Sequence, residues 1–395
     1  MEIYLDNSAT TKVTEGVRDI VSRALYEDYG NPSSMHRLGV KAEQYMKDSA
    51  AIIANTLKVE PKEILFTSGG TEANNLALIG TAMANKRRGN HIITTRIEHP
   101  SVHQPLVYLE ENGFEISFAP VDETGKLIKD KLYELVKENT LLVSIMYVNN
   151  EIGSVQDIEE IAAELKKHKK DLIFHVDAVQ AFGKYRIYPK RTGIDLLSFS
   201  GHKIHGPKGT GVLYVSDKIK INPTIFGGGH QRGLRSGTEN VPGIAGIGQA
   251  VSQLYQSFDE KIARMYHLKQ KFLQQINHLE GVTINGIPKE CTDNFEMEQL
   301  QKTAPHIMSV SFQGVRSEVL LHALEDKGIY VSAGSACSSH HPTPSVTLIA
   351  IGISKDLLES TLRFSMSEMT TEDEIDYTLE QIKQILPNLR KYTRR

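Results

Sequence analysis

The sequence predicts an α/β fold with a mostly parallel central sheet flanked by helices. Short apolar segments alternate with segments of helical spacing, and Gly, Asn and Pro separate them. Several apolar segments end in polar residues, as strands do at the ligand-binding edge of open α/β sheets. With 395 residues, 40% of them hydrophobic, the chain can bury two cores. We expect a large domain at residues 13–255 and a smaller α/β C-terminal domain formed by residues 1–12 and 256–395.

Composition and charge exclude several classes of protein. The formal net charge is −3, so there is no basic excess of the kind that binds nucleic acid directly. No apolar run approaches the ~20 residues of a membrane helix, and no cationic segment followed by an apolar run opens the chain. Two cysteines in a chain of this length argue against a disulfide framework. These features predict a cytoplasmic protein without a membrane partner.

The first elements lead to a candidate phosphate cradle. Residues 1–12 are expected to be an extended arm, and residues 13–26 and 40–57 to be helices separated by the helix-breaking residues 29–34. A strand at residues 63–67 runs into a glycine pair, Thr71 and a helix reaching about residue 83. The N–H groups at such a helix start can bind phosphate. An ordinary glycine turn with a capping threonine is the alternative.

Polar residues follow the next predicted strands. Residues 91–95 precede His99, residues 141–147 precede Asn150, and residues 172–176 precede Asp177 and Gln180. Because carboxyl ends of parallel strands share one edge of a sheet, these side chains could face one crevice.

Lys203 lies in a turn between two apolar strands, residues 195–199 and 211–215. A lysine on a short glycine-containing loop at a strand end can meet an aldehyde, as in enzymes that bind pyridoxal 5'-phosphate (PLP) as a Schiff base. The alternative is a surface lysine in a loop. Beyond it, residues 227–240 are glycine-rich and could wrap an anion or a neighbouring chain, and residues 242–277 are expected to form a long helix containing the domain boundary near Tyr255.

The C-terminal part contains two further candidates. Residues 288–305 are expected to be a mobile loop with an incidental Cys291. Cys337 lies among small polar residues, where a thiol can act as a nucleophile if its pKa of ~8.5 is lowered. A metal site with His340 and His341 is the alternative. Arg363 lies in an apolar strand, where its guanidinium suits a carboxylate ligand or a structural salt bridge.

Together these stretches resemble the cysteine desulfurases of the NifS/IscS type, in class V of the fold-type I PLP-dependent enzymes. The matching runs occur in family order across nearly the whole chain, at residues 4–11, 30–34, 67–75, 98–99, 149–153, 175–180, 200–203, 235–238 and 334–337. The resemblance implies a PLP-dependent homodimer that converts L-cysteine to L-alanine and leaves a persulfide on Cys337. The sulfur would pass to an acceptor protein, such as an iron–sulfur scaffold or a tRNA-thiolation enzyme.

The resemblance also implies roles for individual residues. Lys203 forms the Schiff base and moves protons, Asp177 pairs with the ring nitrogen, and His99 stacks on the ring as a candidate acid or base. The resemblance further implies that Gln180 and Asn150 contact the phenolic oxygen region of the ring. The phosphate would be bound by Gly70, Thr71, Ser200 and His202, and by Thr238 of the partner subunit. The substrate would be bound by Arg363 and Asn31.

The chain departs from the family pattern at Ser338, at His306 and at residues 367–369, and its 288–305 segment is longer. Three other functions remain as alternatives: a selenocysteine lyase, a class V aminotransferase, and a non-enzymatic sulfur-trafficking or regulatory protein of the same fold. An aminotransferase needs a keto-acid acceptor and no thiol, so acceleration by 2-oxo acids would distinguish it.

Overall fold

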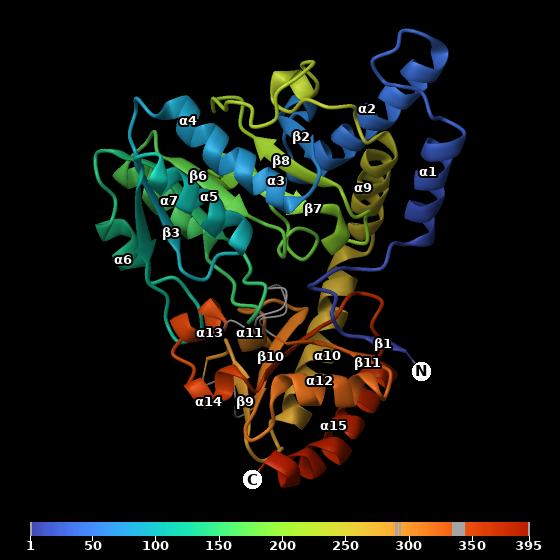
Figure 1. Ribbon diagram of the computed structural model, residues 1–395, viewed down its shortest axis with the longest axis vertical. Helices are drawn as coiled ribbons and strands as arrows, with labels where there is room; N and C mark the ends of the chain where they lie inside the picture. The colour runs from blue at the N-terminus through green and yellow to red at the C-terminus, as the bar shows by residue number, and fades with distance from the viewer. Residues whose placement is uncertain (1, 289–290, 292–293, 334–343, 394–395) are drawn as a thin grey trace.

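The computed structural model describes residues 2–288, 291, 294–333 and 344–393, and these form two larger sheets, each with its own core, and one two-stranded sheet (Figure 1). In this part of the chain the larger sheet has seven strands in the order β2-β8-β7-β6-β5-β3-β4. Their bounds are β2 Ile64–Thr67, β8 Gly211–Val215, β7 Leu196–Ser200, β6 Ile173–Asp177, β5 Thr140–Met146, β3 His91–Thr95 and β4 Glu115–Ala119. Strands β7, β6, β5, β3 and β4 are parallel, which confirms the predicted fold class. Strand β8 runs antiparallel to both of its neighbours.

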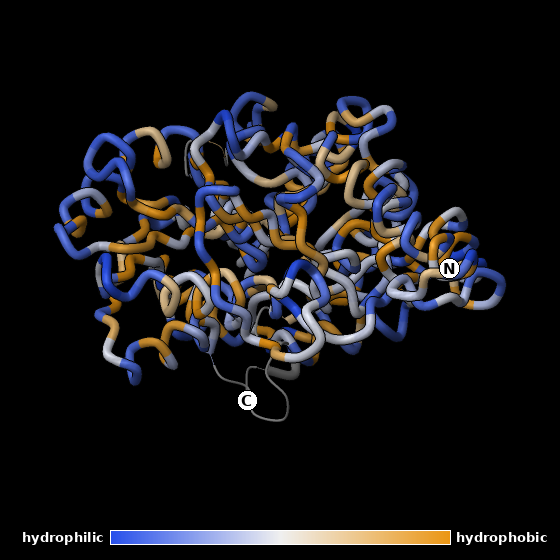
Figure 2. The backbone as a smooth tube through the Cα atoms, turned by 90° about the horizontal axis from the view of Figure 1, so that it is seen from above, coloured by the Kyte–Doolittle hydropathy of each residue, from blue (hydrophilic) through white to orange (hydrophobic). Residues whose placement is uncertain are grey.

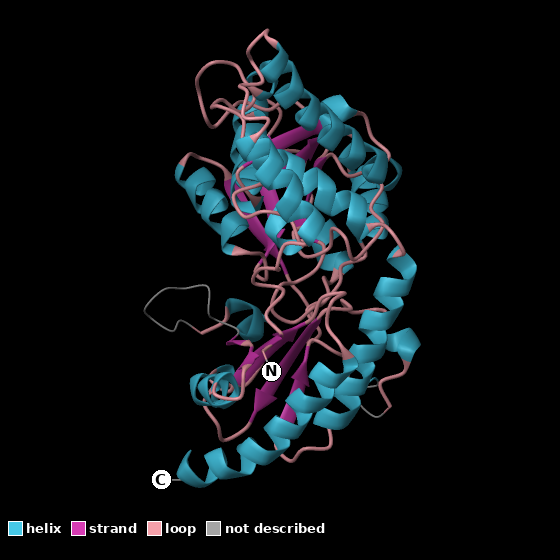
Figure 3. Ribbon diagram, turned by 90° about the vertical axis from the view of Figure 1, so that its right-hand side faces the viewer, coloured by secondary structure: helices cyan, strands magenta, loops and turns pink. Residues whose placement is uncertain are grey.

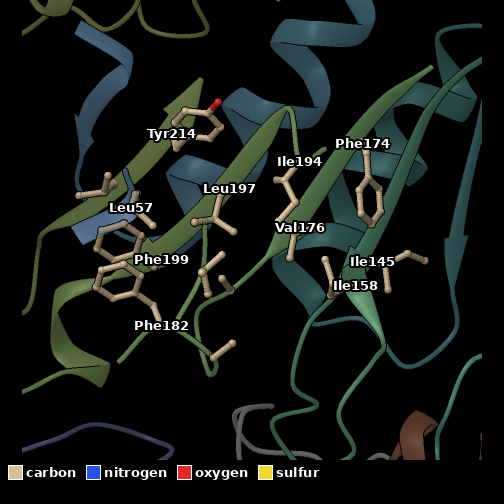
Figure 4. Close-up of a cluster of buried hydrophobic side chains, with 14 of the residues drawn as sticks. Leu57, Ile145, Ile158, Phe174, Val176, Phe182, Ile194, Leu197, Phe199 and Tyr214 are labelled. Carbon is tan, nitrogen blue, oxygen red and sulfur yellow. The ribbon is translucent and has the colours of Figure 1, made fainter. Parts of the chain in front are cut away.

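Apolar side chains alternate between the two faces of this sheet, so each face has its own cluster. Phe174, Val176, Leu197 and Phe199 belong to one cluster, and Ile173 and Leu196 on the same strands belong to the other. Figure 4 shows the first cluster, in which the rings of Phe182 and Phe199 stack with centroids 3.8 Å apart. Burial on both faces accounts for the nearly continuous apolar strands of the sequence.

Helices cover both faces of the large sheet (Figure 3). They are α1 Glu15–Tyr26, α2 Arg37–Leu57, α3 Gly70–Asn75, η2 Leu76–Gly80, α4 Thr81–Asn85, α5 Pro100–Glu111, α6 Lys129–Glu134, α7 Ile158–His168, α8 Pro189–Thr192 and α9 Val241–Leu254. Short 3-10 turns are η1 Pro61–Glu63, η3 Gly201–Lys203 and η4 Gln231–Gly233. In Figure 2 the hydrophobic segments gather inside the molecule and the hydrophilic ones at its rim.

The smaller sheet is antiparallel, with the order β12-β13-β10-β9 in the described residues. Its strands are β12 Ser332–Ala333, β13 Thr361–Ser365, β10 Ile307–Phe312 and β9 Val282–Asn285. Helices α10 Phe258–Ile276, α12 Ser317–Glu325 and α15 Glu372–Thr393 contribute apolar residues to its core. Three short helices accompany them, α11 Met297–Leu300, α13 Val346–Ala350 and α14 Lys355–Leu358.

The N-terminal arm is extended, as predicted, and it connects the two sheets. Strand β1 Ile3–Tyr4 pairs with β11 Ile329–Tyr330, and Asp6 bridges to Ser365 of the small sheet. A few residues later the Thr11 N–H donates to the carbonyl of His202, which follows β7 of the large sheet. The arm therefore crosses the region between the sheets.

Two predictions about the C-terminal part are wrong. The expected single helix at 242–277 is two helices, α9 and α10, because Ser257 adopts left-handed φ/ψ of 50° and 37°, which a right-handed helix cannot accommodate. The described residues of the expected mobile loop 288–305 include buried Phe295 and Leu300 and the short helix α11. Cys291 is buried in the same core. The division into domains at Tyr255 stays a prediction.

No helix in the described ranges is both long and apolar enough to span a bilayer.

Candidate functional site

A cavity of about 300 Å³ lies at the carboxyl ends of the large-sheet strands and reaches Arg363 of the small sheet. Strand register explains why the polar residues meet there: Met146, Asp177 and Ser198 are adjacent on β5, β6 and β7. The predicted residues that line the cavity are Gly70, Thr71, His99, Asn150, Asp177, Gln180, Ser200, His202, Lys203 and Arg363. The sequence analysis missed Ser8, Ala9, Ser101, Met146, Val148 and Val179.

Lys203 reaches the cavity from η3, the single turn that follows β7. Its Nζ donates to the carbonyl of Ser8 and, at 2.9 Å, to that of Ala9. Both acceptors belong to the N-terminal arm. The lysine is therefore held at the cavity wall by the arm, which excludes the alternative of a surface lysine.

Asp177 ends β6 with both carboxylate oxygens occupied. The backbone N–H of Val179 donates to Oδ1 at 2.9 Å, and the Asn74 amide donates to Oδ2 at 2.8 Å. Two N–H donors stabilise the ionised carboxylate. Asn74 is wholly buried and was missed by the sequence analysis. Its place on the helix after the glycine pair was the only local signal that could have drawn attention to it.

His99 is the N-cap of helix α5, and Ser101 fixes the position of its ring. The Ser101 N–H donates to Nδ1 at 3.1 Å, and the Ser101 hydroxyl lies 2.8 Å from the same nitrogen. Burial lowers the pKa of His99; nearby Asp177 opposes this, and Lys203 and His103 add to it. The imidazole is therefore neutral near pH 7.

Gln180 is oriented by two contacts from different parts of the chain. Its Nε2 donates to the Ser8 carbonyl at 2.9 Å, and its Oε1 lies 3.3 Å from Nε2 of His306. Burial lowers the pKa of His306 well below its usual value, with Lys184 the largest of several nearby positive charges acting in the same direction. The neutral ring can then donate Nε2–H to the amide oxygen, which directs the Gln180 amide nitrogen toward the arm and the cavity.

The residues expected to hold phosphate line the cavity near the start of helix α3. Helix α3 begins at Gly70, and the first N–H groups of a helix have no partner within it. A Cβ on Gly70 would lie 2.8 Å from Cγ2 of Val179, so only glycine allows this close approach. Burial, together with the charge of Lys203, lowers the pKa of nearby His202 to about 4. Ser200 supplies a hydroxyl to the same cavity lining.

Arg363 comes from β13 of the small sheet and is only 4% exposed. Its Nη2 donates to Oδ1 of Asp6 at 3.0 Å and its Nη1 to the Asn150 carbonyl at 2.9 Å. The buried Nε has no hydrogen-bond partner among the described residues. The alternative of a structural salt bridge is therefore present, and Arg363 lines the cavity as well.

Two predicted residues, Asn31 and Thr238, do not line the cavity of this chain, and a third lies outside the described residues. Asn31 is exposed and its side chain accepts from the N–H of Ser33. Thr238 is exposed and does not line the cavity. Cys337 lies outside the described residues, as do His340 and His341 of the alternative metal site.

These residues suit PLP chemically. A carboxylate stabilised by two N–H donors can pair with a protonated ring nitrogen, and the helix start at Gly70 with its neighbouring hydroxyls can receive a phosphate. Lys203 and Arg363 line the same cavity, and a guanidinium is a suitable donor for a carboxylate. The cavity therefore offers a partner for each polar group of the cofactor and for an amino-acid substrate.

Comparison with known proteins gives a consistent result. Residues 3–378 match the family described as Aminotransferase class-V. The chain is 39% identical over 388 residues to the cysteine desulfurase IscS of Methanosarcina thermophila, covering 98% of this chain and 93% of that protein. A solved NifS-like protein superposes with a TM-score of 0.90 at 38% identity, covering 98% of this chain and 100% of the other. A structure of SspA in complex with cysteine superposes with a TM-score of 0.76 at 34% identity, covering 94% and 100%.

Proposed function

This chain belongs to the class-V aminotransferase family and, within it, to the cysteine desulfurases of the NifS/IscS type, and from this premise we propose how its residues divide the reaction. It is a PLP-dependent enzyme that removes sulfur from L-cysteine. The observation that carries the assignment of roles is that Lys203, Asp177, His99 and Arg363 line a single cavity.

PLP supplies an electron sink for the substrate carbon. Lys203 carries the cofactor and moves protons at its Nζ, and Asp177 holds the ring nitrogen in its protonated form. Gly70, Thr71, Ser200 and His202 bind the phosphate. Gln180 and Asn150 lie toward the phenolic oxygen, and the neutral His99 lies against the ring.

Arg363 binds the carboxylate of L-cysteine. Its position in the lining of the cavity and the fork geometry of a guanidinium support this role. The contact with Asp6 holds the guanidinium in place before the substrate arrives. Asn31 is proposed to assist at the same carboxylate.

Cys337 takes the sulfur. Its thiolate attacks the sulfur of the bound cysteine, the substrate C–S bond breaks, and the electron pair of that bond stays with carbon, which then gains a proton. L-Alanine leaves and Cys337 retains the sulfur as a persulfide. Two observations support the proposal that the Cys337 thiol can reach the bound substrate. Ala333, four residues before Cys337, pairs with Leu362, and Leu362 directly precedes Arg363.

The active form is a homodimer in which the partner subunit's Thr238 reaches the phosphate. Exposed apolar side chains on and between α1 and α2 support an interface: Tyr26 is 85% exposed, Tyr29 70% and Met35 97%. Phe226, in the glycine-rich segment that contains Thr238, is 80% exposed. Clusters of exposed large apolar residues mark association surfaces. The persulfide sulfur then passes to an acceptor in the cytoplasm, an iron–sulfur scaffold or a tRNA-thiolation enzyme.

The purified chain should bind PLP with a visible absorbance band that Lys203→Ala abolishes. With L-cysteine and a thiol reductant it should release equal amounts of alanine and sulfide. Without reductant, mass spectrometry should find one added sulfur atom on the peptide containing Cys337. Cys337→Ala should abolish turnover, whereas Cys291→Ala, which alters the buried cysteine of the small-sheet core, should preserve it. Full activity of Cys337→Ala would disprove the persulfide role.

A further inference from the structure

The imidazole of His99 is held at the start of helix α5 in a way that determines which nitrogen carries its proton. Pro100, the first helical residue, has no N–H, so the Ser101 N–H is the first donor of the helix. That N–H points at Nδ1 of His99 at 3.1 Å. A proton on Nδ1 would face this N–H and the positive end of the helix. Nδ1 must therefore present its lone pair.

A chain of hydrogen bonds from Asp177 reaches the same nitrogen. The Asn74 amide nitrogen donates to Asp177 Oδ2 at 2.8 Å and to the Ser101 hydroxyl at 2.9 Å. Turning the amide around would place its oxygen against the carboxylate, so the charge of Asp177 fixes its orientation. The Ser101 hydroxyl, having accepted from Asn74, directs its own proton to Nδ1 at 2.8 Å.

Burial makes this chain of contacts hard to rearrange. Asn74 is 0% exposed, and Oδ1 of its amide has no hydrogen-bond partner among the described residues. Ser101 and Asp177 are buried as well. The amide nitrogen makes two hydrogen bonds while the amide oxygen makes none within the described part of the chain, so the two bonds of the nitrogen determine the orientation of the Asn74 side chain.

We infer that His99 is fixed as the neutral imidazole with its proton on Nε2, so that it acts as a permanent N–H donor in the cavity and not as a base. Asn74 and Ser101 are the positioning residues that hold it in this form. The catalytic role of His99 rests on the proposed function. Proton removal from the substrate carbon then falls to Lys203. A helix start that keeps a catalytic imidazole neutral is known as a way to make it a donor.

The charged and titratable groups around His99 agree with this assignment. Burial lowers its pKa, and although Asp177 opposes that shift, Lys203 and His103 reinforce it. Both carboxylate oxygens of Asp177 already accept a hydrogen bond, one from the Asn74 amide and one from the Val179 N–H.

The protonation state can be read directly by solid-state ¹⁵N NMR of the full chain labelled at histidine, with and without PLP. The His99 signals are identified by their loss in His99→Gln. We expect a protonated Nε2 and an unprotonated, hydrogen-bonded Nδ1 near pH 7. In Ser101→Ala the hydroxyl donor is lost, so the pH at which Nδ1 takes up a proton should rise by about one unit. Ser101→Thr, which keeps the hydroxyl, should restore the wild-type value.

Kinetics distinguish a donor from a base. His99→Gln keeps an N–H but cannot take up a proton, so it should retain at least roughly tenfold more activity than His99→Ala. Equal loss in both variants, or a wild-type His99 protonated on Nδ1, would overturn the inference. The NMR result requires no cysteine turnover. It therefore separates failure of this inference from failure of the proposed desulfurase activity, which the release of alanine and sulfide tests independently.

Discussion

The two walls of the cavity are built in different ways. On the large-sheet wall, Asp177, Asn74, Ser101 and His99 are joined by hydrogen bonds among themselves, and all follow strands of one sheet. On the small-sheet wall, Arg363 depends on Asp6 from the N-terminal arm and on the carbonyl of Asn150. The hydrogen bonds among these four residues need only the large sheet to be formed, although Lys203 and Gln180 of the same wall also depend on the arm. The second wall is complete only when the arm and both sheets have come together.

This difference fits the two tasks of the site. A cofactor that stays bound requires partners in one lasting arrangement, whereas a substrate must enter and leave. A guanidinium held by a residue of the arm can exchange that partner for an incoming carboxylate. One wall of the cavity therefore has a fixed network of hydrogen bonds, and the other has a guanidinium whose partner can be exchanged.

The largest effect is expected from removing the guanidinium of the small-sheet wall. Arg363→Ala removes the proposed ligand of the substrate carboxylate and leaves Asp6, whose side chain is 21% exposed, without its partner. Truncating one member of a buried, hydrogen-bonded charge pair weakens binding by roughly 3–5 kcal/mol, so kcat/KM for L-cysteine should fall roughly 10²- to 10⁴-fold. Steady-state kinetics measure it, and PLP affinity should change far less.

The Asp6→Asn variant is the matched control for that prediction. It keeps Arg363 and weakens only the competing carboxylate, so KM should stay the same or fall. If Arg363→Ala left KM and kcat unchanged, the small-sheet wall would have no role in binding the substrate.

A pH effect should appear behind the large-sheet wall, at Glu98, which is buried and does not line the cavity. Burial raises its pKa to about 8, and its Oε2 has no hydrogen-bond partner among the described residues. Between the unfolded pKa of ~4.3 and this value, the folded chain holds a proton that the unfolded chain has released. The free energy of unfolding should therefore decrease with rising pH by roughly 3–4 kcal/mol between about pH 5 and pH 8.

Glu98→Gln cannot titrate, so it should lose this part of the pH dependence. Chemical denaturation at several pH values measures it. Glu110→Gln, an exposed carboxyl on α5, serves as the control and should follow the wild type. If the free energy of unfolding of Glu98→Gln depended on pH as that of the wild type does, the Glu98 carboxyl would be ionised in the folded protein.

A smaller effect is expected where the two walls meet, at His306. It precedes β10 of the small sheet and contacts Gln180 after β6 of the large sheet. His306→Leu removes the donor to the amide oxygen, worth about 1 kcal/mol, so PLP affinity should drop roughly fivefold. Titration of the cofactor-free chain measures it. His306→Asn, which retains an N–H donor, should bind PLP more tightly than His306→Leu; the reverse order would contradict the proposed contact.

Much of the site could be predicted because its residues carry local signals. Asp177 and Lys203 each follow an apolar strand, and the glycine pair precedes a helix, so the order of strands and polar ends is visible along the chain. The partners of these residues carried no such signal. Asn74 lies 103 positions from Asp177, and Ser8 lies 172 positions from Gln180. The kink at Ser257 was also missed, because helical spacing continues on both sides of it.

Apolar periodicity and strand-end polarity, which are properties of neighbouring residues, were enough to predict the α/β class and the parallel sheet, whereas the roles of Lys203, Asp177 and Arg363 were implied by the resemblance of their motifs to a known family. Only the tertiary structure decided that Asp6 would meet Arg363, that the arm would hold Lys203, and that Asn74 would connect Asp177 to His99. Those contacts depend on strand register and on the path of the arm, which are set when distant segments pack together.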